Sequence, residues 1–199
     1  LSISHIDDYI DTMNGQRGLY NKISVALSKQ EISSRKESLT KLIQDGQSTL
    51  SKLIDSNAKL WKQLSAFSEN QTSIVEPRQI VLKVNETTRT QPDWSQIEIC
   101  WENVDTIMSQ VQNNINKLHI GLENTNDDET KLGDTLLSDI SSSQERLNEI
   151  KRNLSGFIIY PQIENIYWVS IGSNDQEISL NVAPIHVGKI LDEKSSESN

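Results

Sequence analysis

Five basic residues on one predicted helix are the side chains of this sequence best suited to binding chemistry. They are Lys52 and Lys59, one heptad apart, Lys62 one turn later, and Arg35 and Lys36 near the helix start. A row of exposed cations without nearby carboxylates can contact the phosphates of DNA. The same spacing also fits the solvated flanks of a helix that packs through its apolar side. Both interpretations fit the sequence, and the first makes these five residues the predicted DNA-binding site.

The remaining reactive residues are not spaced for catalysis or metal binding. His5, His119 and His186 are far apart and have no Cys or His partner at ligand spacing, and Cys100 is the single cysteine. The sequence contains no Gly-rich phosphate loop and no paired nucleophile and base. We therefore expect no catalytic residue, no metal site and no cofactor in this chain.

Charge is distributed unevenly along the chain. The formal net charge is −9, but residues 1–90 contain 12 Lys/Arg and 10 Asp/Glu, whereas residues 91–199 contain 7 Lys/Arg and 18 Asp/Glu. An acidic segment repels phosphates, so any contact with DNA is expected from the first half.

The sequence also bounds where the protein functions. No stretch approaches the roughly 18 consecutive apolar residues of a membrane span, and no signal peptide is present. With one cysteine and no disulfide framework, a cytoplasmic location without a membrane partner is the simplest expectation. The chain starts at Leu1 without a Met, which suggests a fragment of a longer protein.

Apolar spacing predicts the elements that position these side chains. Steps of three and four residues predict a short helix and three long ones, over 4–14, 31–71, 92–122 and 129–154. Gly46 and Asn57 are weak points in the first long stripe, whereas Trp101 and Met108 lie on the most regular stripe and are expected to be buried. Alternating residues predict strands over 78–87, 163–171 and 177–182, with a hairpin turn over 172–175.

These elements predict an α+β fold. We expect an elongated bundle of three long helices plus the short N-terminal helix, with a small antiparallel sheet at one end. Residues 1–192 are expected to form one domain, and the polar residues 193–199 a disordered tail.

Two terminal segments resemble a known family. The stretch Ile166–Leu191 contains Tyr167-Trp168-Val169, a turn, a second strand, and then Ala183-Pro184 followed by an apolar residue and a Val. It resembles the part of DinG/XPD-like ATP-dependent DNA helicases that leads into the second motor domain. The stretch Leu1–Ile23 is similar to the segment just after the DEAH box of that family.

The resemblance implies an inserted, arch-like helical domain without its motor. In the family, this domain interrupts the first motor domain after the Walker B motif and borders the path of single-stranded DNA. ATP and magnesium would bind the motor domains of the same polypeptide, because this chain has no Walker A loop and no DEAH box. The expected partners are these motor domains and single-stranded DNA.

A helical-bundle module for protein–protein interaction, without enzymatic role, is the alternative. Heptad spacing supports it equally well. The strand and Ala-Pro segment at the C-terminus favours the helicase interpretation, because a simple bundle does not need it.

Overall fold

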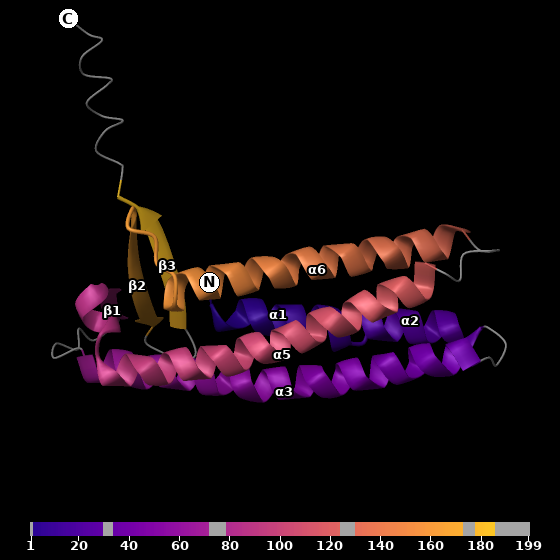
Figure 1. Cartoon of the computed structure of the whole chain (residues 1–199), viewed down its shortest axis with the longest axis horizontal. Coiled ribbons are helices and arrows are strands. Elements are labelled where there is room, and N and C mark those ends of the chain that lie inside the picture. The colour runs from indigo at the N-terminus through magenta and orange to yellow at the C-terminus, as the bar shows by residue number, and fades with distance from the viewer. Residues whose placement is uncertain (1, 30–33, 72–78, 124–129, 173–177, 186–199) are drawn as a thin grey trace, which may run out of the picture. The chain divides into compact units, whose positions relative to one another are not determined.

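The computed structural model describes residues 2–29, 34–71, 79–123, 130–172 and 178–185. Of these residues, 77% are helical, and the others include a small three-stranded sheet (Figure 1). The helices are α1 (Ile3–Asn14), α2 (Leu19–Ser28), α3 (Ser34–Gln71), α4 (Glu86–Arg89), α5 (Pro92–Glu123) and α6 (Thr130–Ile158). The strands are β1 (Gln79–Val84), β2 (Asn165–Gly172) and β3 (Ile178–Pro184). The predicted α+β class is confirmed.

The chain divides into two compact units. One, called the bundle unit, comprises Ser4–Leu60 and Glu102–Arg152. The other, called the sheet unit, comprises Leu1–Ile3, Trp61–Trp101 and Asn153–Asn199. Both units take residues from α3, α5 and α6, so the boundary falls within helices and not in linkers.

The bundle unit is held together by apolar stripes of the predicted kind. Steps of three and four residues place one side of each helix inward, and those residues are buried, including Met108 as expected. Buried residues include Ile6, Tyr9 and Met13 of α1, Leu39, Ile43, Leu50 and Leu53 of α3, Val104, Met108, Val111 and Ile115 of α5, and Leu136, Ile140 and Leu147 of α6.

Helix α2 was not among the predicted elements. No helix was predicted between residue 14 and the first long helix, yet four residues of α2 are buried: Leu19, Tyr20, Ile23 and Leu27. Their spacing is itself helical, so the signal was present in the sequence. Gly18 precedes the helix with an extended backbone and no side-chain cap, which hides its start from a search for capping residues.

The sheet unit confirms the predicted pairing of β1 with the C-terminal strands. The strand order is β1-β2-β3, all antiparallel, with Leu82 opposite Val169 and Val84 opposite Tyr167. The face that carries Tyr167, Val169 and Leu180 is buried. Buried helical side chains of the same unit complete its core: Trp61, Leu64, Phe67, Trp94, Ile97, Trp101, Leu154, Phe157 and Ile158. The expected burial of Trp101 is confirmed.

The end of β1 differs from the prediction. The strand was expected to run to residue 87, but it ends at Val84 and α4 follows. Asn85 caps this helix: its Oδ1 accepts from the backbone N–H of Thr88 at 2.9 Å, and the Thr88 hydroxyl accepts from the Asn85 N–H. Because this cap starts a helix at Glu86, the strand cannot continue beyond Val84. Of the turn predicted over 172–175, Gly172 is instead the last residue of β2. Residues 173–175 and the tail at 193–199 lie outside the described residues.

Candidate functional site

The predicted cations of α3 are exposed, but a carboxylate shares their surface. Lys52 and Lys59 belong to the bundle unit, are exposed, and form no ion pair with a described residue. Asp55, also exposed, is three residues after Lys52 and four before Lys59. That spacing puts all three side chains on one face of the helix. The two lysines are exposed as expected. The carboxylate of Asp55 lies on the same face, however, and makes this surface less favourable for a phosphate.

The other three predicted residues do not join Lys52 and Lys59. Lys62 is exposed but belongs to the sheet unit. Nη2 of Arg35 donates to the carbonyl oxygen of Gly121 at 3.2 Å, and that carbonyl is one of the last four of α5. A cation at a helix C-terminus satisfies unpaired carbonyls and stabilises the helix dipole, so Arg35 has a structural role. Lys36 is half-buried and already has an interaction partner.

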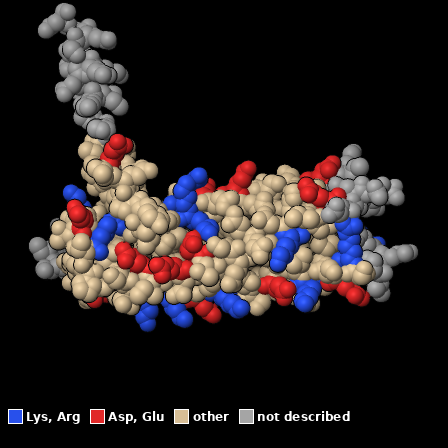
Figure 2. All heavy atoms as spheres, viewed as in Figure 1, with Lys and Arg blue, Asp and Glu red and all other residues tan. Residues whose placement is uncertain are grey.

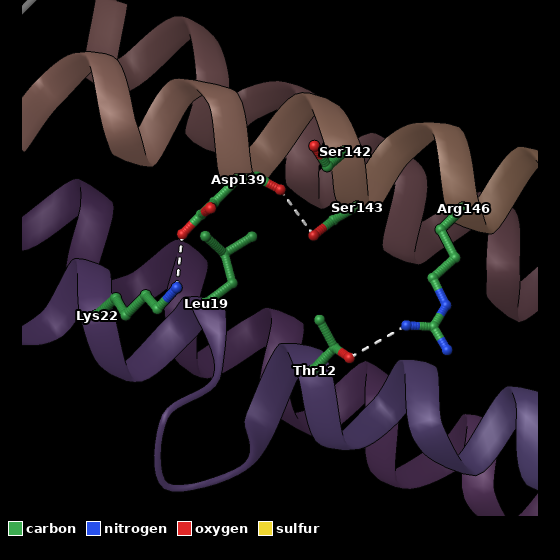
Figure 3. Close-up of a pocket in the computed structure, with 7 residues that line it drawn as sticks. All are labelled: Thr12, Leu19, Lys22, Asp139, Ser142, Ser143 and Arg146. Carbon is green, nitrogen blue, oxygen red and sulfur yellow. Dashed lines mark hydrogen bonds and ion pairs between the residues drawn. The ribbon is translucent and has the colours of Figure 1, made fainter.

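A second group of charged residues lies in the bundle unit, in an opening that we call the notch (Figure 3). Its volume is about 190 Å³. Helices α1, α2 and α6 supply its lining, which consists of Thr12, Leu19, Lys22, Asp139, Ser142, Ser143 and Arg146.

Two contacts flank the notch. Nζ of Lys22, from α2, lies 2.6 Å from Oδ2 of Asp139, from α6. Nη1 of Arg146 donates to Oγ1 of Thr12 at 3.4 Å, and the Thr12 hydroxyl in turn donates to the backbone oxygen of Asp8 at 2.7 Å. Each contact joins a different helix to α6, and the opening lies between them (Figure 3).

Arg146 is the cation of the notch without a carboxylate partner. It is half-buried and forms no ion pair with a described residue. Its charge lowers the pKa of the Tyr9 phenol, but burial is the larger effect, and the net result is a raised pKa. The hydroxyl of Tyr9 is buried and has no hydrogen-bond partner among the described residues. Tyr9 thus stays neutral and does not compensate the charge of Arg146.

The notch was not predicted from the sequence. Asp139, Ser143 and Arg146 lie at steps of four and three residues on α6, so a helical plot puts them on one face. Lys22 and Thr12 come from elsewhere in the chain, and no sequence pattern links them to α6. Arg146 lies in the acidic half, where no contact with DNA was expected.

The third candidate is Arg89 of α4, in the sheet unit, whose guanidinium lies near three aromatic rings. Its guanidinium carbon lies 5.0 Å from the ring centre of Trp94, 5.4 Å from that of Tyr167 and 5.9 Å from that of Phe157. Nη1 donates to the carbonyl oxygen of Ile158, the last residue of α6, at 2.8 Å. Burial lowers the pKa of Arg89, while Tyr167 and Glu98 act in the opposite direction. Arg89, which is half-buried, therefore caps α6 and packs against aromatic rings of its unit.

The described residues contain no group of three or more His, Cys, Asp or Glu side chains that could hold a metal ion. No described helix is long and apolar enough to cross a membrane. Comparison with models of protein families, with curated proteins and with solved structures finds no match to this chain.

Proposed function

We propose that this chain is the inserted, arch-like accessory domain of a DinG/XPD-like ATP-dependent DNA helicase. In this role it guides or encloses single-stranded DNA, while motor domains outside the chain bind ATP and magnesium and hydrolyse the nucleotide. The domain itself performs no chemistry.

The observation that carries the proposal is the pairing of Ser2 with Ser179. These two residues form an isolated antiparallel bridge in the sheet unit. The segment before α1 and strand β3 therefore lie side by side, and each belongs to one of the two stretches that resemble the helicase family. Insertion of a domain is favoured when its two connections to the host lie close together. The bridge places the segment before α1 on the same sheet as β3, the last strand before the second connection.

The order of the two C-terminal strands supports the proposal. Tyr167, Trp168 and Val169 lie in β2, and β3 ends with Ala183 and Pro184. Two strands followed by Ala-Pro is the order that the resemblance implies for this segment.

The exposed surface of α3 that includes Lys52 and Lys59 is the proposed contact with DNA. Figure 2 shows that cationic and acidic side chains are interspersed on the visible face of the described residues, without a large area of either sign. Contact with DNA is thus expected to be local and weak, which suits a domain that guides a strand held mainly by the motor.

The test is made in the full-length polypeptide that contains this chain. The double variant Lys52→Glu/Lys59→Glu should reduce unwinding severalfold and leave ATPase activity without DNA unchanged. Lys117→Glu is the matched control, because Lys117 is an exposed lysine of α5 in the acidic half. Asp55→Asn should have the opposite effect and strengthen DNA binding, because it removes the carboxylate between the two lysines. Equal unwinding by the double variant and the control would remove α3 from the DNA path.

One observation favours the alternative, a module for protein–protein interaction. Val81 of β1 and Ile166 of β2 lie on the face of the sheet opposite the buried one and are 55% and 38% exposed. Exposed apolar side chains on one face of a sheet can contribute to a contact surface. Absence of DNA-stimulated ATPase activity in the full-length polypeptide would overturn the helicase proposal and favour this alternative.

A further inference from the structure

The notch between α1, α2 and α6 combines unpaired donors with room for a small anion. Arg146 reaches from α6 toward Thr12, and Lys22 reaches from α2 toward Asp139, with the opening between them (Figure 3). Apart from the Nη1 bond to Thr12, the guanidinium of Arg146 meets no acceptor among the described residues. Its remaining N–H groups are therefore available to a ligand.

Charge in the notch favours an anion. The described lining contains two cations, Lys22 and Arg146, and one carboxylate, Asp139. Asp139 is occupied by Lys22 at 2.6 Å, so Arg146 remains uncompensated. A guanidinium stays charged at all physiological pH values, is weakly hydrated, and forms paired hydrogen bonds with oxyanions.

We propose that the notch binds a phosphate group, with Arg146 as the donor. A phosphate carries more charge and more acceptor oxygens than a carboxylate, so it can use more of the free N–H groups of Arg146. The volume of about 190 Å³ is several times the roughly 30 Å³ that one water occupies in the liquid. It accommodates a phosphate group with a few waters. The phosphate can be free or part of a nucleic-acid backbone, and the second source rests on the proposed function.

Calorimetric titration of the 199-residue chain with inorganic phosphate tests the site. Arg146→Gln should weaken phosphate binding about tenfold, because it removes the charged fork. Arg152→Gln should change it less than about twofold, since Arg152 is exposed on the same helix and does not line the notch. Asp139→Asn should tighten binding by removing the opposing carboxylate. Thermal unfolding of each variant checks that the fold is retained.

Three results would overturn the phosphate site: no phosphate binding by the unmodified chain, equal weakening by Arg146→Gln and Arg152→Gln, or equally tight binding of an oligoglutamate peptide. A single-stranded oligothymidylate distinguishes the two sources. If it competes with phosphate and loses affinity in Arg146→Gln, the backbone is the ligand. If phosphate binds but the oligonucleotide does not compete, the notch is a phosphate site, and the nucleic-acid backbone is not its ligand. Failure of this test leaves the helicase proposal standing, because that proposal is tested by unwinding with Lys52 and Lys59.

Discussion

The two units each contain an arginine that forms no ion pair with a described residue, and they surround it differently. Arg89 of the sheet unit lies among three aromatic rings and caps the end of α6. Arg146 of the bundle unit borders an opening and meets one hydroxyl, that of Thr12, at 3.4 Å. Both arginines line an opening of their own unit. The protein supplies rings and a carbonyl oxygen to Arg89 but only one hydroxyl to Arg146, so the fold holds Arg89 more firmly.

The largest expected effect on stability comes from replacing Arg89, the arginine that contacts the aromatic rings. Arg89→Ala should lower the free energy of unfolding by about 2–4 kcal/mol, because it removes the ring contacts and a charged hydrogen bond. Arg146→Ala should cost less than about 0.5 kcal/mol, as expected for a side chain outside the core. Denaturation followed by tryptophan fluorescence suits the measurement, because Trp61, Trp94, Trp101 and Trp168 all belong to the sheet unit. Circular dichroism covers the bundle unit. Equal losses in the two variants would remove the distinction between the arginines.

A smaller effect is expected at Gly46, in the bundle unit. The hydroxyl of Tyr20 donates to Oδ1 of Asn114 at 2.9 Å, and Nδ2 of Asn114 donates to the carbonyl oxygen of Leu42 at 2.7 Å. A Cβ at Gly46 would overlap both the Tyr20 hydroxyl and the Asn114 side chain. Gly46→Ala should therefore destabilise the chain by about 1–3 kcal/mol, the usual cost of overpacking.

The cause can be checked by combining Gly46→Ala with Tyr20→Phe, measured by chemical denaturation and circular dichroism. Removing the hydroxyl relieves part of the overlap, so the double variant should lose less than the sum of the two single losses. Simple additivity would mean that Gly46 is not held by this contact.

The smallest effect is expected at Gly156, in the sheet unit, and it has the opposite sign. A Cβ at this position of α6 meets nothing within 4 Å. Gly156→Ala should stabilise the chain by about 0.5–1 kcal/mol, because alanine is the better helix former. Tryptophan fluorescence during denaturation reports this gain. A loss of stability would show that the free space at Gly156 is used by the native structure.

The sequence by itself determined most of the fold. Regular apolar steps located the long helices, and alternation located the strands, because burial of one face forces those periods on any amphipathic element. The burial of Trp101 and Met108 follows from the same pattern. Helix α2 carried the same signal and was overlooked, whereas the end of β1 depended on the cap formed by Asn85 and Thr88.

Only the tertiary structure decided what single residues do. Gly46 and Asn57 were predicted to weaken the α3 stripe. Instead Gly46 admits the hydrogen bond between Tyr20 and Asn114, and Asn57 is buried and hydrogen-bonds Asp7. The notch needs side chains from three helices, and Arg35 became a helix cap because the end of α5 lies beside it. Period and composition describe each element alone. Which partner, cavity or carbonyl a side chain meets depends on how distant elements pack, and that is not written in local spacing.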